Sequence, residues 1–215
     1  MKFEKRQDEI YLWTRSDAAY EGAILDRHLL LTDGYFLDWF HVELEEEAQI
    51  DSWFHVVGKL SDASNPVSDI VIDSHDKSEG AESNPAAQSG YEFIQLLRRS
   101  TSQSDYGSPV SWTSAVMAPG LEVEAGLVSL STWLSSTMAA YEIQTPGVSL
   151  DPSIECGGLC LRERGRIADF ITVYRDGAQP VILSDPHCED SIQQISLTTE
   201  SGLRTIRLHS DHGLA

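Results

Sequence analysis

Apolar and polar residues alternate along several short stretches of this chain. In residues 202–209, Ile206 and Leu208 alternate with polar side chains. In residues 127–134, Leu130 falls on the opposite side from its serine neighbours. Successive side chains of a β-strand point to opposite faces of a sheet. The period of two therefore predicts strands that bury one face and expose the other.

Runs of this kind recur along the chain, separated by Gly, Pro, Asn, Asp and Ser. This spacing predicts an all-β protein, and no window shows a convincing helical stripe. We expect one antiparallel β-sandwich domain over residues 1–215, with about 12–14 strands. The expected strands lie near residues 9–15, 20–25, 27–32, 35–41, 48–57, 91–98, 109–116, 127–134, 138–144, 158–163, 167–174, 180–184, 191–198 and 202–209.

The run IADFITVY, residues 167–174, is apolar on both faces. A strand of this kind is typical of the centre of a sheet that is covered on both sides. We therefore expect it to be a central strand.

Residues 61–90 interrupt the rhythm, because they are rich in Ser, Asp, Asn, Gly and Pro. Only Ile70, Val71 and Ile72 have the composition of a strand. A loop of this length is either functional or disordered. We expect a polar loop, or a solvated excursion from the sandwich.

The chain carries 15 basic and 34 acidic side chains, a net charge of −19. Such a field repels nucleic acid and anionic membranes, and we expect neither as a partner. It also repels sulfated or uronate-rich glycans where no basic patch offsets it. No run approaches the ~18 apolar residues of a membrane span. The start, MKFEKRQDE, has no apolar signal-peptide core, and the localisation stays open.

The three cysteines are Cys156, Cys160 and Cys188. An odd number does not favour a disulfide framework. The pair Cys156 and Cys160 lacks the second pair that a zinc ribbon requires. We expect reduced structural thiols, no metal and no cofactor.

Three segments resemble one family of enzymes. The first is YEGAILDRHLLLT, residues 20–32, and the second is YFLDWF followed by DSWFHVVG, within residues 35–58. The third, residues 146–177, is similar to a late hairpin with an Arg-Gly turn and an F-x-T-V run. Together they resemble the C-terminal β-domain of heparinase II/III-type polysaccharide lyases.

The resemblance implies a β-sandwich that accompanies a helical toroid in enzymes cleaving uronate glycans by β-elimination. In that family a Tyr and a His act on the C5 proton, while a neighbouring group neutralises the uronate carboxylate. The present sequence departs from this pattern, because it has no helical half. The family's metal hallmark is also absent upstream of Tyr20. The resemblance therefore implies a helical catalytic domain as partner, either covalent or a separate chain.

Asp38 and His55 occupy the Asp and His positions of the second segment. By parity His55 shares a face with Asp51 and Trp53, which is a candidate for contact with a glycan or a metal. The alternative is that both are satisfied interior residues. A buried Asp38 needs a partner, and we expect Arg27 or His55 to provide it.

Five tryptophans could stack on sugar rings, although core packing is the usual use of Trp in a sandwich. Trp112 and Trp133 are the better candidates for an exposed platform, because Ser and Thr flank them.

These observations support three hypotheses. The first is a non-catalytic accessory domain that supports a substrate cleft with a helical domain. The second is a stand-alone carbohydrate-binding module that uses Trp112 or Trp133. The third is a structural or assembly protein that uses a sheet edge or an apolar face.

Overall fold

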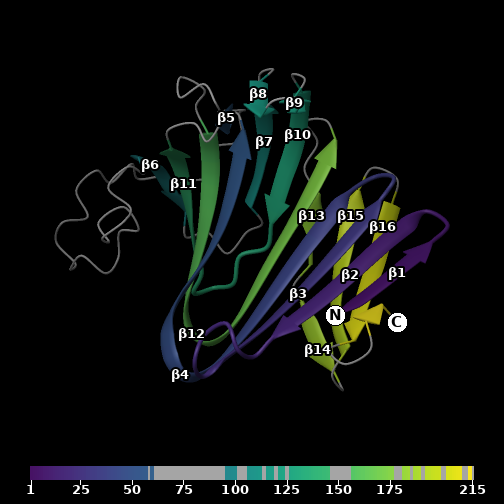
Figure 1. Cartoon of the computed structure of the whole chain (residues 1–215), viewed down its shortest axis with the longest axis vertical. Helices are drawn as coiled ribbons and strands as arrows, with labels where there is room; N and C mark the ends of the chain where they lie inside the picture. Colours follow the sequence, from purple (N-terminus) through teal and green to yellow (C-terminus); the bar gives the residue numbers. More distant parts are fainter. Residues whose placement is uncertain are drawn as a thin grey trace.

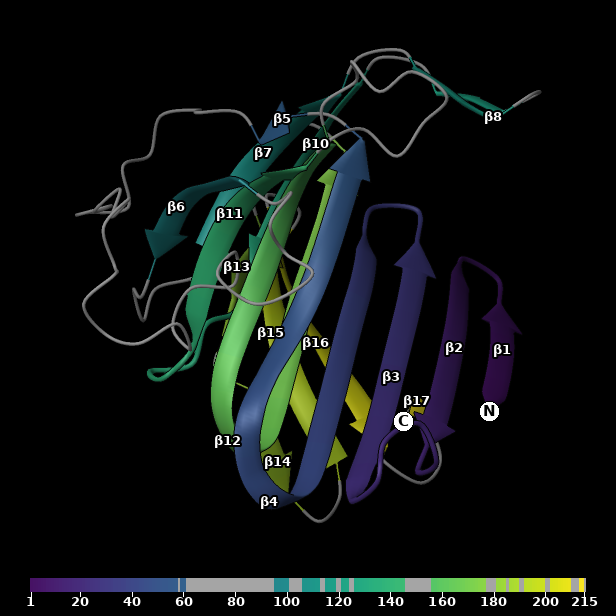
Figure 2. The same ribbon diagram turned by 60° about the vertical axis from the view of Figure 1, so that its left-hand side comes forward.

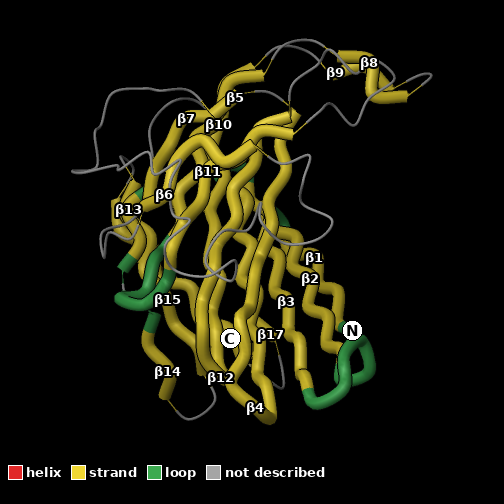
Figure 3. Tube along the Cα trace, turned by 90° about the vertical axis from the view of Figure 1, so that its left-hand side faces the viewer, coloured by secondary structure: helices red, strands yellow, loops and turns green. Residues whose placement is uncertain are grey.

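The computed structural model confirms an all-β protein built from antiparallel sheets packed as a sandwich. None of the described residues forms a helix long and apolar enough to cross a membrane. Figure 3 shows strands and loops only. The structure describes residues 1–57, 59–60, 95–100, 106–112, 115–118, 121–123, 126–145, 156–176, 181–184, 186–189, 192–199, 202–209 and 213–214.

The larger sheet has ten strands in the order β1-β2-β3-β4-β12-β10-β7-β5, with β11 beside β12 and β6 beside β11 (Figure 1). Every pairing in it is antiparallel. Its strands are β1 (Lys2–Arg6), β2 (Glu9–Ser16), β3 (Ala23–Thr32), β4 (Phe36–Val57), β5 (Lys59–Leu60), β6 (Gln95–Ser100), β7 (Tyr106–Trp112), β10 (Gly126–Thr132), β11 (Ala139–Thr145) and β12 (Cys156–Asp176).

Two very long strands, β4 and β12, pair along their whole length and bend together (Figure 2). Gly165 lies opposite Ala48, but Ile167 lies opposite Glu43, so residues 44–47 of β4 face Arg166 alone. This surplus on one strand is a large β-bulge, which bends a strand and increases its twist. The bend divides the sheet into two arms.

The smaller sheet has five strands, and its order is β13-β15-β16-β17 with β14 beside β15. The strands β8 (Ala115–Ala118) and β9 (Leu121–Val123) form a separate two-stranded sheet. The strands of the smaller sheet are β13 (Ile182–Leu183), β14 (His187–Glu189), β15 (Ile192–Thr199), β16 (Gly202–His209) and β17 (Gly213–Leu214).

The two largest apolar clusters lie on opposite faces of the larger sheet. The first lies inside the bend, where Phe170 from one arm joins Leu159 from the other. The second lies between the two sheets, where Trp39 and Ile171 join Leu197 and Leu208. Neighbouring residues of β12 thus enter different clusters. The expectation that residues 167–174 form a central strand covered on both sides is confirmed.

Several predicted strands were wrongly divided. Residues 23–25 of segment 20–25 belong with 27–32 to the single strand β3, and residues 36–41 and 48–57 both lie in β4. The Arg-Gly segment is no hairpin turn, because β12 runs continuously through Gly165. Polar residues such as Glu45–Glu47 had indicated a break, but they are exposed strand residues at the bend.

The described residues form 17 strands rather than about 12–14. The basic strand β1 was missed because its sequence, KFEKR, has one apolar residue. Several others have only two to four residues, too few to show an alternation. The polar segment 61–90 lies outside the described residues.

Candidate functional site

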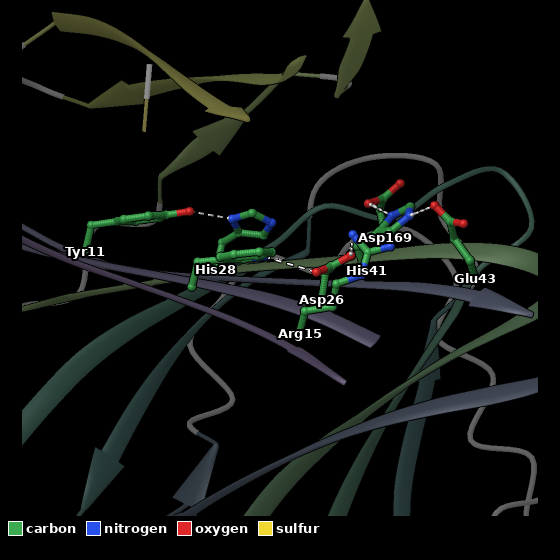
Figure 4. Close-up of polar contacts among 8 residues, drawn as sticks. Tyr11, Arg15, Asp26, His28, His41, Glu43 and Asp169 are labelled. Carbon is green, nitrogen blue, oxygen red and sulfur yellow. Dashed lines mark hydrogen bonds and ion pairs between the residues drawn. The ribbon is translucent and has the colours of Figure 1, made fainter. Parts of the chain in front are cut away.

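A row of charged side chains crosses four strands of the larger sheet. Arg15 of β2 lies opposite Asp26 of β3, Asp26 opposite His41 of β4, and His41 opposite Asp169 of β12. We call Arg15, Asp26, His41 and Asp169 the charged row. Figure 4 shows its members with Tyr11, His28 and Glu43. Positive and negative groups alternate along it, an arrangement that favours cross-strand pairing.

Successive cross-strand rows become more polar along one face of the sheet, and the charged row is the last of them. The first cross-strand row, Tyr11, Leu30, Leu37 and Val173, is apolar and lies under the smaller sheet. The next row consists of Trp13, His28, Trp39 and Ile171, so that an imidazole lies between two indoles. The charged row follows two residues further along each strand. The period of two thus places its polar side chains on the face that forms the intersheet core.

His41 lies between two carboxylates. Its Nδ1 is 2.8 Å from Asp169 Oδ1 and its Nε2 is 3.1 Å from Glu43 Oε1. Carboxylates only accept hydrogen bonds, so both ring nitrogens must donate and the ring is an imidazolium. Burial opposes this charge, but the bonds to Asp169 and Glu43 outweigh it and raise the pKa of His41 to about 9.

His28 has the opposite character. Burial, with the positive His41 nearby, lowers the pKa of His28 to about 4, so its ring is neutral at pH 7. The Tyr11 hydroxyl lies 2.7 Å from His28 Nδ1 and donates to it when that nitrogen carries no proton. Burial also raises the pKa of Tyr11. Tyr11 and His28 therefore form a neutral, buried hydrogen-bonded pair.

Two indole groups, the partly buried Trp13 and the buried Trp39, bind the carboxylates of the charged row. Trp13 Nε1 donates to Asp26 Oδ1 at 3.0 Å, and Trp39 Nε1 donates to Asp169 Oδ1 at 2.8 Å. Arg15 lies 3.7 Å from the other oxygen of Asp26. Buried charges are tolerated where they are paired and hydrogen-bonded. The site is thus a network whose members satisfy one another.

Tyr and His are the residue types that perform proton transfer, and this network holds both. Tyr11 and His28 are each only 1% exposed, however, so a substrate would need the site to open before reaching them. Within the described part of the chain, no group of three or more His, Cys, Asp or Glu side chains could hold a metal. The network's evident role is to hold four strands in register.

Asp38 lies on the opposite face and is bound by Arg27. Arg27 Nε donates to Asp38 Oδ1 at 2.9 Å, and Nη2 donates to Oδ2 at 2.5 Å. The expectation that Arg27 or His55 pairs with Asp38 is confirmed for Arg27. A ligand-binding role for Asp38 stays a prediction, although its buried carboxylate is already occupied.

The structure separates the other predicted site residues. Trp133 is partly buried and packs against the intersheet cluster. Trp112 is the last residue of β7, on a different strand of the larger sheet. His55 lies in β4 opposite Gly158. The side chains of His55 and Trp112 lie outside what is described, so their ligand-binding role stays a prediction, as does that of Trp133.

Asp51 lies on the predicted face with Trp53 and has a partner that the sequence did not indicate. Arg162 donates to both carboxylate oxygens of Asp51, each at 2.7 Å, and lies over the ring of Tyr141. The pairing links β4 to β12 in the arm beyond the bend. The carboxylate of Asp51, like that of Asp38, is therefore already bound by an arginine.

Sequence reasoning did not single out Tyr11, Asp26, His28 or Asp169. Asp26 and His28 share parity within β3, and Asp169 lies between Ala168 and Phe170, so the face of each could be read within its own strand. The missing signal was the register, which alone brings side chains from four strands into one row. Register depends on turn geometry and on partners distant in sequence.

The fold and the network define an antiparallel sandwich with a partly buried charged row across its larger sheet. No family model matches the sequence, and no curated protein matches it. Among solved structures, the chain is similar to the heparan sulfate lyase HepC from Pedobacter heparinus, with a TM-score of 0.58 and 9% identity over 96% of this chain. A mutant of that lyase gives 0.59 over 98%, and a heparinase III with methylated lysines gives 0.55 over 97%, both at 9% identity.

The chain spans 27% of the length of the HepC chain that it matches. At this identity the likeness concerns the fold. The predicted resemblance to the β-region of heparinase-type lyases is thereby confirmed at the level of the fold.

Proposed function

We propose that this chain is a non-catalytic β-sandwich accessory domain that supports a substrate cleft together with a helical catalytic domain. Its fold is similar to part of a heparan sulfate lyase, and that part accounts for about a quarter of the lyase chain. Uronate glycans are the corresponding substrate class. The isolated domain supplies shape and support rather than proton transfer.

The proposal rests on the burial of Tyr11 and His28 and on the hydrogen bond between them. β-Elimination needs an acid and a base that reach the substrate, and a catalytic base must lie within hydrogen-bond reach of the proton it removes. Both members of this pair are buried and bound to each other. His41, the other histidine of the network, is protonated and has both nitrogens bound to carboxylates, so it cannot serve as a base near neutral pH.

The first experiment tests for lyase activity. The purified chain is incubated with heparan sulfate, hyaluronan, chondroitin sulfate and alginate, and the ultraviolet absorbance of unsaturated uronate is followed. We expect no rise above buffer. A rise that persists in Tyr20→Phe, a matched change at an exposed tyrosine, but disappears in Tyr11→Phe or His28→Gln would overturn the proposal.

The second experiment tests the accessory role itself. A helical toroid domain encoded in the same genome is mixed with this chain, and its lyase activity is compared with and without it. We expect a one-to-one complex with higher activity than the helical domain alone. Unchanged activity with every such domain contradicts the accessory role.

A further inference from the structure

Strands β2 and β3 are apolar on both faces, but next to β1 the described residues cover only one of these faces. Residues 10–13 and 29–31 are nearly continuous apolar runs. Tyr11 and Leu30 point into the intersheet cluster and are buried. Continuous apolar runs are typical of strands buried on both sides. The uncovered side therefore has the composition of an interface.

Cross-strand register gathers the uncovered residues into one surface. Phe3 lies opposite Leu12 and Leu12 opposite Leu29, while Ile10 lies between Lys5 and Leu31. Residues opposite one another on a sheet have Cβ atoms about 5 Å apart. We call this surface the edge patch, and it consists of Phe3, Lys5, Ile10, Leu12, Leu29 and Leu31.

The apolar residues of the edge patch are accessible to a partner. Phe3 is 63% exposed, Leu31 47% and Ile10 36%, while Leu12 and Leu29 between them are half-buried. A single exposed apolar residue needs no explanation, but contiguous apolar surface rimmed by charge marks an interaction site.

The charge around the edge patch is opposite in sign to that of the whole chain. The chain has a net charge of −19, but Lys5 of β1 and the half-exposed Arg27 of β3 lie on the patch's face. Lys2 and Arg6 of β1 lie on the opposite face, where both pair with Glu4. Among the described residues of β1 to β3, no carboxylate shares the patch's face, and Asp38 of β4, opposite Leu29, is 3% exposed and bound by Arg27. This part of the face thus offers apolar contact and positive charge.

These features favour a protein over a glycan or a second copy of the chain. Glycans bind by stacking on flat aromatic rings, whereas the patch is mostly aliphatic. A two-fold dimer through the patch would bring the two Lys5 residues and two strongly negative molecules together. A partner with apolar residues flanked by carboxylates fits both the contact surface and its charge.

We propose that the edge patch docks an amphipathic helix of a partner domain, with the helix's apolar side on Phe3, Ile10 and Leu31 and its acidic residues facing Lys5 and Arg27. The charge and apolar character of the partner follow from the patch, whereas its helical form rests on the proposed function. Amphipathic helices bind apolar surfaces in this manner through residues spaced three and four apart.

The test uses three labelled synthetic peptides and measures fluorescence anisotropy against the full chain. The first is an amphipathic helix with Leu on one side and Glu on the other, the second replaces Glu by Lys, and the third alternates Val and Glu so that it stays extended. We expect the acidic helix to bind, more weakly at high salt. The basic helix is expected not to bind.

Variants of the chain show whether the acidic helix binds at the edge patch. The double change Phe3→Ser and Leu31→Ser is expected to weaken binding of the acidic helix at least about tenfold, and Lys5→Glu is expected to weaken it as well. The matched control changes Ile182→Ser and Leu203→Ser, which are 62% and 71% exposed on the smaller sheet, and should leave binding unchanged. Urea unfolding of each variant confirms that it is folded.

Three outcomes overturn the inference: no binding of either acidic peptide, binding that survives the patch variants, or concentration-dependent self-association that these variants abolish. The last would assign the patch to a second copy. Binding of the extended acidic peptide alone would keep the acidic partner but remove its helical form, and with it the support from the proposed function. The lyase assay reports on the proposed function independently of all three.

Discussion

Asp38 illustrates how a single ion pair lets β4 place a carboxylate among apolar side chains. Its own side chain is 4% exposed, whereas that of Arg27 is 51% exposed. The guanidinium also lies 5.9 Å above the ring of Phe40. An unpaired buried carboxylate would be costly. Arg27 therefore stabilises the fold mainly by satisfying Asp38.

Arg27→Met is expected to lower the free energy of unfolding by about 2 kcal/mol, because it leaves a buried carboxylate without its two charged hydrogen bonds. The measurement is urea denaturation at pH 7. Arg15→Met is the control on the neighbouring strand, because Arg15 lies 3.7 Å from Asp26, beyond hydrogen-bond distance, and Trp13 still donates to Asp26 when Arg15 is replaced. A long ion pair of this kind contributes about 0–1 kcal/mol, so equal losses in the two variants would contradict this account.

The two histidines of the network respond to pH in opposite directions. His28 has a pKa of about 4, below its ordinary 6.5, so the unfolded chain binds more protons and stability falls as pH drops from 6.5 toward 4. His41 has a pKa of about 9, above 6.5, so its contribution is complete below pH 6.5 and is lost as pH rises through 9.

Stability is therefore expected to be highest between these two transitions, with slopes of at most about 1.4 kcal/mol per pH unit from each histidine. Urea midpoints from pH 4 to pH 10 provide the measurement. His41→Gln should remove the decline on the alkaline side and leave the acidic side in place. An alkaline decline that is unchanged in His41→Gln would mean that His41 is not held as an imidazolium.

At the scale of the element, β12 is the strand on which both cores depend. Phe170 lies in the cluster inside the bend and Ile171 in the cluster between the sheets, and both are fully buried. Phe170→Ala and Ile171→Ala should cost about 3–5 and 2–5 kcal/mol respectively. Ile167→Ala, at a position 61% exposed on the same strand, should cost under about 0.5 kcal/mol. Denaturant unfolding measures all three.

The fold class and the central strand could be predicted because the local sequence shows both the alternation of apolar and polar residues and a run that is apolar on both faces. The continuity of β4 and β12 could not. A run such as Glu45–Glu47 has the composition of a turn, but it is the bulge that continues β4 between Glu43 and Ala48, both of which pair with β12. Tertiary pairing overrides local preference in such cases.

The candidate site was predictable in part for the same reason. The pairing of Asp38 follows from burial and from the nearest available cation, Arg27. The charged row needed the register of three separate strand pairs, which joins residues up to 128 positions apart in sequence, as for His41 and Asp169. No local pattern contains that information.

At the scale of the molecule, the net charge of −19 opposes the compact state through self-repulsion. Salt screens such repulsion, with a Debye length near 30 Å at 0.01 M and about 8 Å at 0.15 M. The melting temperature is therefore expected to rise when sodium chloride is increased over this range, as calorimetry can measure. A melting temperature that falls with salt would mean that the ion pairs of the network outweigh the repulsion.

Strands β4 and β12 both run through the two arms, and this pairing determines how the sheet unfolds locally. Because each strand is one covalent piece that crosses the bend, neither arm can lose its central ladder without disturbing the other. Backbone amides of Phe54 and Leu159, on one side of the bend, should exchange hydrogen with the same opening free energy as those of Phe40 and Phe170 on the other. The bend is therefore a corner within one cooperative unit, and not a hinge between two.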